Sequence, residues 1–243
     1  MSLLSKKKKR INVNREEYVI SASTPFNVTE AFRNLKASIC ISLPKKVNGE
    51  GAVITFTSPN SCEGKTTVAV NLAMMLAVSN AKVMLIDADI RKGRVAKMLK
   101  ADTEPGLSGY LSGQVEKGQI IHKYSDKLDF ITRGMSSPRP YELLESEAMR
   151  EFLNELKKEY DYVIIDTPPL PALSDALAVA TKSDGTVVVC RHRQSNVNEI
   201  AKTLNTLTFA SAPILGVVVN DYKAERTNRY GYYYRYYYEK SGK

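Results

Sequence analysis

Side chains that bind phosphate and metal ions occur at three points along this 243-residue chain. The first point is segment 58–67, which reads Ser-Pro-Asn-Ser-Cys-Glu-Gly-Lys-Thr-Thr. Where such a turn opens a helix, successive backbone N–H groups and the helix dipole favour a bound anion. The lysine would reach the β- and γ-phosphates of a nucleotide, and the first threonine hydroxyl would bind Mg²⁺. We therefore predict a phosphate-binding loop made by Cys62, Glu63, Gly64, Lys65, Thr66 and Thr67.

This loop departs from the usual Gly-x-x-x-x-Gly-Lys-[Ser/Thr] pattern, because Pro59 stands at the first glycine position. Gly-Lys-Thr is also a frequent tripeptide, so an ordinary loop that caps a helix is the alternative interpretation. The flanking residues favour nucleotide binding. Segment 52–57 is apolar and β-branched, as in a buried strand, and segment 68–77 is rich in Ala, Leu and Met, as in a buried helix.

The other two points are aspartates at the ends of apolar segments. Asp87 and Asp89 end the segment that begins at residue 82, and Asp166 ends segment 162–166. Residues two apart on an extended chain project to the same side, so Asp87 and Asp89 can face one site at the carboxyl end of a strand. Helix caps or turn residues are the alternative. An apolar strand that ends in aspartate is the layout that binds Mg²⁺, directly or through water.

Strand-like and helix-like segments alternate along the chain. Strands are expected at 52–57, 82–87, 128–131, 162–166, 186–190 and 214–220. Helices are expected at 27–43, 68–77, 146–160 and 197–209, short helices or loops at 107–111 and 115–122, and a loop at 137–140. Strands that are apolar throughout and alternate with helices indicate an α/β fold, a mainly parallel sheet flanked by helices.

The composition is that of a globular protein, with 43% hydrophobic and 25% charged residues, and the length suits one α/β domain. The chain has no apolar run of 18 residues and begins without the apolar segment of a signal peptide, so we expect neither a membrane span nor secretion. Cys40, Cys62 and Cys190 are scattered, odd in number and without metal-ligand spacing, which fits a reducing cytoplasm.

The net charge of +9 comes from the two ends of the chain. Residues 1–15 carry six Lys or Arg and no acid, and residues 223–243 carry six Lys or Arg and two Glu, which leaves 16–222 with a net charge of −1. We expect a basic, disordered segment 1–15, a folded domain 16–222 and a flexible, tyrosine-rich segment 223–243. A folded nucleic-acid-binding surface is not expected without excess Lys and Arg in the domain. The run at 6–10 suits an anionic membrane surface or an acidic partner, or is a solvated tail.

Two further segments bear on interactions. Asn27 is expected to cap a helix in which Glu30, Arg33 and Lys36 lie along one side, either as a solvent-exposed face or as an interface. Segment 230–238 has seven tyrosines in nine residues and no aliphatic residue. It could stack on nucleic acid, act as an adhesive low-complexity segment, or present phosphorylation sites.

Together, the phosphate loop, Ile-Asp-Ala-Asp-Ile-Arg at 86–91, Ile-Ile-Asp-Thr-Pro-Pro at 164–169 and the tyrosine cluster resemble the bacterial protein-tyrosine kinases. More narrowly, the chain resembles the separate cytoplasmic kinase of Gram-positive capsule and exopolysaccharide systems, over residues 15–238. The resemblance implies a P-loop fold similar to MinD- and ParA-like ATPases. The chain has no Gly-rich kinase loop or His-Arg-Asp motif of the eukaryotic kinases.

The resemblance also implies an enzyme that uses ATP and Mg²⁺ to phosphorylate its own tyrosines. Lys65 and Thr66 would hold the phosphates and Mg²⁺, Asp87 would accept the proton of the incoming tyrosine, and Asn220 would contact adenine. Asp89 and Asp166 would complete the metal shell beside Thr66. The expected catalytic residues are thus Lys65, Asp87, Asp89 and Asp166. The expected autophosphorylation sites are Tyr230, Tyr232, Tyr233, Tyr234, Tyr236, Tyr237 and Tyr238.

Glu30, Arg33 and Lys36 fall on the family's Glu-x-x-Arg-x-x-Arg oligomer motif, with Lys36 in place of the final arginine. Lysine cannot form the same planar bidentate contact. The resemblance implies a homo-oligomeric ring in the unphosphorylated state, a membrane-anchored adaptor of the polysaccharide co-polymerase type as activator, a tyrosine phosphatase, and no nucleic acid. The implied location is the cytoplasm, at the inner face of the membrane through the adaptor.

Two other functions fit parts of the sequence. One is a MinD- or ParA-like ATPase switch without kinase activity, in which hydrolysis controls dimerisation or membrane binding. The domain lacks the basic excess of DNA-binding switches, the chain ends without an amphipathic helix, and a switch does not need the tyrosines. The other is a nucleotide-binding scaffold without enzymatic activity.

Overall fold

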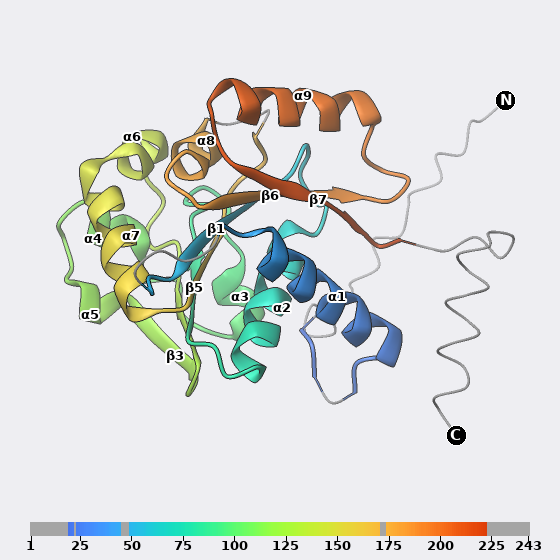
Figure 1. Ribbon diagram of the computed structural model, residues 1–243. Coiled ribbons are helices and arrows are strands. Elements are labelled where there is room, and N and C mark those ends of the chain that lie inside the picture. Colours follow the sequence, from blue (N-terminus) through green and yellow to red (C-terminus); the bar gives the residue numbers. More distant parts are fainter. Residues whose placement is uncertain (1–18, 22, 45–48, 171–173, 223–243) are drawn as a thin grey trace, which may run out of the picture.

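The computed structural model describes residues 19–21, 23–44, 49–170 and 174–222. The strands are β1 (Ala52–Thr57), β2 (Val83–Asp87), β3 (Ile121–Ser125), β4 (Leu128–Ile131), β5 (Tyr162–Asp166), β6 (Gly185–Arg191) and β7 (Ile214–Asn220). They form one sheet in the order β3-β4-β2-β5-β1-β6-β7 (Figure 1). Neighbouring strands are parallel, except that β3 and β4 are antiparallel at one edge. The predicted α/β fold with a mainly parallel sheet is confirmed.

Helices cover both faces of the sheet (Figure 1). They are α1 (Phe26–Ser42), α2 (Lys65–Val78), α3 (Val95–Leu99), α4 (Leu107–Leu111), α5 (Lys117–Ile120), α6 (Pro140–Glu145), α7 (Glu147–Glu159), α8 (Asp175–Ala180) and α9 (Val197–Phe209). Successive residues of β1, such as Val53 and Ile54, belong to different core clusters. One cluster holds α1, α2 and α3, and the other holds α4, α6, α7 and α8. The central strands are therefore buried on both faces, which explains their unbroken apolar sequences.

Four short elements, α3, α6, α8 and β3, were not predicted. Segment 115–122 was expected to be helical or loop, yet it holds the single turn α5 and the start of strand β3. All residues of β3 are exposed or partly exposed, so the strand lacks the apolar signal of the central strands. The helices α3, α6 and α8 each have six residues or fewer. Elements this short do not complete the 3.6-residue apolar pattern on which sequence-based assignment depends.

The expected cap of α1 is wrong. The helix begins at Phe26, one residue before Asn27, and Pro25 is its N-cap. The carbonyl oxygen of Pro25 accepts hydrogen bonds from the backbone N–H groups of Val28 and Thr29, at 3.0 and 3.1 Å. The proline therefore sets the first turn, and no side chain caps it. The tails expected at 1–15 and 223–243, with the predicted autophosphorylation tyrosines, lie outside the described residues.

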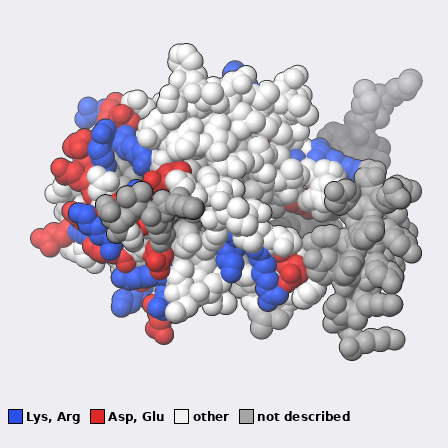
Figure 2. All heavy atoms as spheres, viewed as in Figure 1, with Lys and Arg blue, Asp and Glu red and all other residues white. Residues whose placement is uncertain are grey.

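Within the described residues, no helix combines the length and the apolar composition that crossing a bilayer requires. The face in Figure 2 carries charge unevenly. Lys, Arg, Asp and Glu side chains crowd together around α5, α6 and α7, and few charged side chains lie over α9 and β7 (Figures 1 and 2). The two signs are interspersed on this face, so the described part of it presents no broad basic surface of the kind that binds a nucleic-acid backbone.

Candidate active site

The predicted site residues meet because of the strand order. β5 lies between β1 and β2, with Asp166 in register with Phe56 on one side and Asp87 on the other. The phosphate loop leaves the end of β1 and enters α2. Three neighbouring strands thus deliver the loop and two carboxylates to the same edge of the sheet, as expected for the carboxyl ends of parallel strands.

Lys65 and Thr66 both donate hydrogen bonds to the carboxylate of Asp166. The Lys65 ammonium forms an ion pair with Asp166 through Oδ1, and the Thr66 hydroxyl donates to Oδ2 at 2.7 Å. Asp166 is fully buried and Lys65 is only 7% exposed. Burial raises the pKa of Asp166, and the neighbouring Lys65 charge and the hydrogen bonds from Lys65 and Thr66 oppose that rise. Lys65, expected to bind phosphate, and Thr66, expected to bind Mg²⁺, therefore both contact Asp166, another expected metal ligand.

Asp87 is a buried carboxyl wrapped by its own loop. Its Oδ1 accepts the N–H of Asp89 at 3.2 Å, and its Oδ2 accepts the N–H of Val95 at 3.0 Å. Gly93 makes this possible, because a Cβ atom there would lie 2.4 Å from the Asp87 carboxylate. Burial, and secondarily the charge of Asp166, raise the pKa of Asp87 to about 8. A group with such a pKa can accept and release a proton near neutral pH.

This titration should be visible in stability. The Asp87 carboxyl has a pKa of about 8 in the folded chain and an ordinary value of 3.8 in the unfolded chain. At a pH between these two values, it therefore takes up a proton when the chain folds. The free energy of unfolding of the metal-free protein should therefore fall by up to about 1.4 kcal/mol per pH unit as the pH rises from 5 to 7, until the folded pKa is passed. Thermal unfolding from pH 5 to 9 measures this slope. Asp87→Asn should flatten it, and equal slopes in both proteins would contradict the titration of Asp87.

Asp89 is partly buried and lies close to the other two carboxylates, since its charge raises the pKa of both Asp87 and Asp166. Its Oδ1 accepts the backbone N–H of Lys92 at 2.9 Å, which closes a tight turn after β2. The structure thus brings together all three predicted aspartates with Lys65 and Thr66. Each aspartate has at least one carboxylate oxygen in a hydrogen bond.

The donor set suits Mg²⁺ with a nucleotide. Thr66 and the aspartates provide hard oxygen atoms, the ligand type that Mg²⁺ prefers. Among the described residues, no three His, Cys, Asp or Glu side chains converge as a self-sufficient metal centre. Mg²⁺ in nucleotide sites is commonly held by one or two carboxylates together with the phosphates of the substrate. The residues present therefore fit a metal that arrives with ATP.

The phosphate loop is held in shape from the last strand. Gly64 has a left-handed φ of 87°, and a Cβ atom there would lie 1.9 Å from the Asn220 side chain. Asn220, predicted to contact adenine, donates its Nδ2 to the carbonyl oxygen of Glu63 at 2.9 Å. Cys62, also predicted in the loop, is exposed with a left-handed φ of 67°. Asn220 thus lies directly against the loop, at the end of β7.

Glu63, predicted as a nucleotide-binding residue, directs its buried carboxylate away from the helix start. Its Oε2 accepts the N–H of Asn60 at 3.1 Å, and its Oε1 accepts the Ser195 hydroxyl. Asn60 in turn donates its Nδ2 to Glu199 in the first turn of α9, at 2.7 Å. The loop is therefore tied to α9, a connection between residues more than 130 positions apart that no sequence pattern indicated. Only the backbone of Glu63 is available to a phosphate in this arrangement.

Arg91 and Asp175 are a second pair that sequence reasoning missed. Arg91 donates its Nε to Oδ2 of Asp175 at 2.8 Å and its Nη2 to Oδ1 at 3.4 Å. Asp175 begins α8 and is 2% exposed. The hydrogen bond to Asp175 raises the pKa of Arg91 above its ordinary value, and burial, a smaller effect, acts in the opposite direction. The pair links the loop that carries Asp89 to α8. Arg91 belongs to the Ile-Asp-Ala-Asp-Ile-Arg motif at 86–91, but no feature of the sequence indicated Asp175 as its partner.

The predicted oligomer residues lie on α1, outside the nucleotide site. Glu30 and Arg33 form an ion pair within the helix, and the Lys36 ammonium donates to the Ser79 hydroxyl, just past the end of α2, at 2.6 Å. Arg33 remains more than half exposed. The three residues do share one side of the helix, as the spacing predicted.

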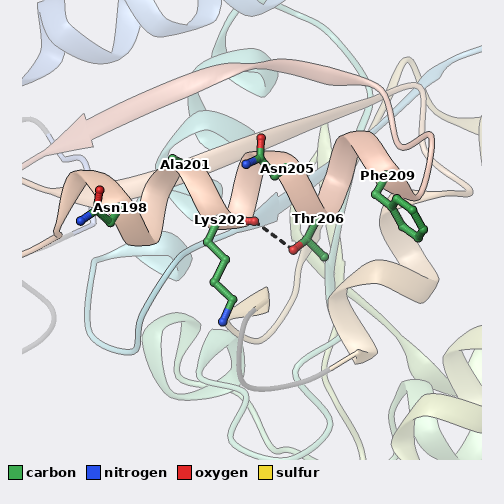
Figure 3. A pocket seen from close by; sticks show the side chains of 6 residues that line it. All are labelled: Asn198, Ala201, Lys202, Asn205, Thr206 and Phe209. Atoms are coloured by element: carbon green, nitrogen blue, oxygen red, sulfur yellow. Dashed lines mark hydrogen bonds between the residues drawn. The ribbon is translucent and has the colours of Figure 1, made fainter.

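A shallow hollow of about 520 Å³ lies elsewhere, along the outer surface of α9 (Figure 3). It is lined by Asn198, Ala201, Lys202, Asn205, Thr206 and Phe209. The Thr206 hydroxyl is already bonded to the Lys202 carbonyl at 2.9 Å (Figure 3). The hollow contains none of the predicted site residues and a single charged group, so it does not provide the phosphate and metal ligands that the sheet edge provides.

Comparisons with known proteins relate the whole domain to characterised families. The AAA domain family matches residues 51–212. The chain is 33% identical over 217 residues to the tyrosine-protein kinase YwqD of Bacillus subtilis, a match that covers 88% of this chain and 90% of that protein. It is 35% identical over 207 residues to the tyrosine-protein kinase etk of Escherichia coli, which covers 85% of this chain and 28% of that protein. The chain therefore spans under a third of the length of such longer relatives.

Solved structures show the same likeness. The kinase domain of the Escherichia coli tyrosine kinase ETK matches with a TM-score of 0.73 and 32% identity, over 82% of this chain and 79% of that domain. The chimerical protein CapA2B2 matches with a TM-score of 0.76 and 29% identity, over 83% and 87%. A more distant match is the apo McdA structure from Cyanothece, with a TM-score of 0.59 and 25% identity, over 69% and 71%. These matches confirm the predicted P-loop fold of the MinD and ParA type.

Proposed function

The chain belongs to the family of bacterial tyrosine-protein kinases, and on this premise we propose that it phosphorylates its own C-terminal tyrosine cluster. The γ-phosphoryl group of ATP passes to tyrosines of a second copy, in trans, and the reaction regulates capsular or exopolysaccharide synthesis and export. One observation carries the proposal. Lys65, Thr66 and Asp166 meet beside the buried carboxyl of Asp87 at one edge of the sheet.

The nucleotide is held by groups that already face one another. Lys65 would bind phosphate oxygens of Mg·ATP, and Thr66, Asp89 and Asp166 would hold the metal ion. Lys65 and Asp166 would then exchange their mutual ion pair for contacts with the nucleotide and the metal. When bound, Mg²⁺ neutralises charge that develops on the transferring phosphoryl group. We take Asn220, which holds the loop through Glu63, to contact the adenine of the nucleotide as well.

Asp87 accepts the phenolic proton. Unperturbed tyrosine has a pKa of about 10, and proton transfer is most effective when the base is not far below the acid. A carboxyl with a pKa of about 8 is a better match than an ordinary aspartate with 3.8. The hydrogen bonds from Asp89 and Val95 hold it in place, so it is oriented before the tyrosine arrives.

A direct test separates the kinase from an ATPase switch. The full chain is purified from an expression host, treated with a phosphatase and incubated with Mg·ATP, and phosphotyrosine is followed by immunoblotting alongside phosphate release. A kinase regains phosphotyrosine, whereas a switch releases phosphate without labelling itself. A variant with the seven tail tyrosines changed to phenylalanine is the control, and it should stay unlabelled.

The partners belong to the same proposal. The similarity to CapA2B2, a chimera that joins parts of two proteins, supports a second polypeptide that works with this kinase domain. We take this partner to be a membrane-anchored adaptor of the polysaccharide co-polymerase type, which activates the kinase and recruits it to the inner face of the cell membrane. A tyrosine phosphatase then reverses the modification.

Oligomerisation through α1 should respond to phosphorylation. Segment 223–243 carries a net charge of +4, and each phosphotyrosine adds about −1.5 to −2, so seven would bring it to roughly −7 to −10. Multiply phosphorylated tails should then repel one another. We expect the dephosphorylated chain to assemble through Glu30, Arg33 and Lys36, and the assembly to dissociate after ATP is added.

Light scattering before and after ATP measures this change in mass. Arg33→Glu, at an exposed position of α1, should prevent assembly in both states, and the variant with the seven tail tyrosines changed to phenylalanine should stay assembled throughout. If the wild type and the phenylalanine variant keep the same mass, the tail reports activity and does not control assembly.

A further inference from the structure

The segment that follows Asp89 is strongly basic. Residues 91–100 read Arg-Lys-Gly-Arg-Val-Ala-Lys-Met-Leu-Lys, with five cations and no acid. The near-neutral charge of the whole domain conceals this local excess. The segment leaves the end of β2, turns through Gly93 and enters α3.

Three of these cations have no side-chain partner among the residues that the structure describes. The charged groups of Lys92, Arg94 and Lys97 are exposed and form no ion pair or hydrogen bond with any residue in the described part of the chain. The arginines nearby differ, since Arg91 is paired with Asp175 and Arg133 donates to the carbonyl oxygen of Ile90 at 3.1 Å. We call Lys92, Arg94 and Lys97 the basic rim.

The basic rim lies beside the proton acceptor of the proposed reaction. The Asp87 carboxylate accepts the backbone N–H of Val95, and Arg94 is the residue directly before Val95. Gly93 is close enough that a Cβ atom would touch both carboxylate oxygens. Side chains at 92, 94 and 97 therefore start from, or just after, the backbone that encloses Asp87.

An unmodified tail gains little from these cations. Segment 223–243 is itself positive, so the basic rim repels it. A phosphotyrosine instead carries a charge of about −1.5 to −2 and three acceptor oxygens that arginine and lysine bind well. The tyrosines stand in two runs of three, at 232–234 and 236–238. Adjacent residues of an extended chain are roughly 3.3–3.6 Å apart along it. With one tyrosine at Asp87, a phosphate on a neighbour lies near the basic rim.

We propose that the basic rim is a phosphotyrosine-binding site, through which one phosphorylated tail tyrosine directs the phosphorylation of its neighbours. The inference rests on the proposed kinase function. The chemical step is unchanged: the phenolic oxygen bonds to the γ-phosphorus, the bond from that phosphorus to the β–γ bridging oxygen breaks, and ADP leaves. The phenolic proton passes to Asp87. What the basic rim adds is affinity for a substrate that is already partly phosphorylated.

The test uses the full chain with its seven tail tyrosines changed to phenylalanine, and three peptides with the sequence of residues 228–240. One peptide is unmodified, one carries phosphotyrosine at Tyr234, and one carries glutamate there. We expect kcat/KM to be about tenfold higher for the phosphopeptide at low salt, and the preference to shrink as salt is added. Arg94→Gln with Lys97→Gln should abolish the preference without lowering the rate on the unmodified peptide.

Matched controls fix the interpretation. Lys123→Gln with Lys202→Gln removes the same charge from exposed positions on β3 and α9, and should keep the preference. A preference that survives Arg94→Gln with Lys97→Gln, or equal use of all three peptides, overturns the inference and leaves the kinase function intact. Equal rates for the phosphotyrosine and glutamate peptides overturn it too, because the basic rim then recognises acidity and not phosphotyrosine.

A binding measurement covers the case in which no peptide is phosphorylated, which would defeat the proposed function. Fluorescence anisotropy of labelled peptides without nucleotide should give about tenfold tighter binding of the phosphopeptide than of the unmodified one. Arg94→Gln with Lys97→Gln should remove this difference, and a single variant, Lys92→Gln, should reduce it in part. Equal binding of the two peptides to the unsubstituted basic rim would refute the site whatever the activity.

Discussion

Replacing Lys65 with methionine is expected to lower the rate of ATP-dependent tyrosine phosphorylation by at least about 10²–10³-fold, the usual cost of removing one group that stabilises charge in a transition state. Lys65 begins α2 and is directed at the carboxylate that should hold the metal. It is the single ammonium group of the loop, so no neighbouring residue of segment 58–67 can take over its contact with the phosphates. Radiolabelling with γ-labelled ATP measures the loss.

The variant should fold, although Lys65 does not lie in open solvent. It is almost fully buried against Asp166, and deleting one member of a buried pair commonly destabilises a protein by about 3–5 kcal/mol. Here Asp166 keeps the Thr66 hydroxyl, and burial raises its pKa so that it can take up a proton in place of the lost partner. The melting temperature should therefore fall more at high pH, where Asp166 is ionised, than at low pH, where it is protonated. Lys65→Met with Asp166→Asn should recover part of that loss and remain inactive.

Undiminished labelling of Lys65→Met would move the active site elsewhere in the molecule. An equal loss of labelling in a matched control, Lys82→Met, would show that the assay is sensitive to any lysine. Lys82 lies just before β2, at the opposite end of that strand, where its ammonium sits over the Tyr160 ring at 4.7 Å. That contact is unrelated to the nucleotide, so the control should keep its activity.

Asp87→Asn is expected to separate nucleotide binding from transfer. Removal of a general base typically slows a reaction by 10²–10⁴-fold, and the affinity for Mg·ATP should change little if Asp87 is not a metal ligand. The substitution is not silent in structure. Asp87 accepts one N–H on each oxygen, from Asp89 and Val95, and an asparagine can accept only one of them. The loop at 88–95 should therefore be locally less stable, by about 1–3 kcal/mol.

Nucleotide affinity and transfer rate, measured on the same preparation, show whether Asp87 is the proton acceptor or a metal ligand. Fluorescent ATP-analogue binding within a few-fold of wild type, together with lost transfer, supports Asp87 as the proton acceptor. A parallel loss of affinity would instead place Asp87 among the metal ligands, beside Asp89 and Asp166. Asp89→Asn provides the comparison, because its expected role predicts weaker binding of Mg·ATP.

The central strands and their aspartates were predictable because burial on both faces leaves an unmistakable apolar run. β1, β4, β5 and β7 have the predicted bounds, and so do α4 and α9. The loop before α2 and the two strands that end in Asp87 and Asp166 could thus be assigned to one edge of the sheet. Sequence alone could not show that β5 lies between β1 and β2, and this order is what brings Asp166 to Lys65.

Contacts between distant segments were beyond the sequence. Arg91 and Asp175 are 84 residues apart, and Glu63 and Ser195 are 132 residues apart, so no spacing rule connects them. The short antiparallel strand β3 escaped notice because its side chains are not buried. The cap of α1 was misplaced because a proline carbonyl, not the favourable Asn27 side chain, begins the helix.

The most direct test of the central claim is the location of the phosphate. The dephosphorylated full chain is incubated with Mg·ATP, and mass spectrometry maps the modified residues over time in wild type and in Lys65→Met. The account predicts phosphate on tyrosines of segment 230–238, added one after another in the wild type and absent from the variant. Phosphate found on serine or threonine, or ATP hydrolysed with no phosphotyrosine in that segment, would contradict it.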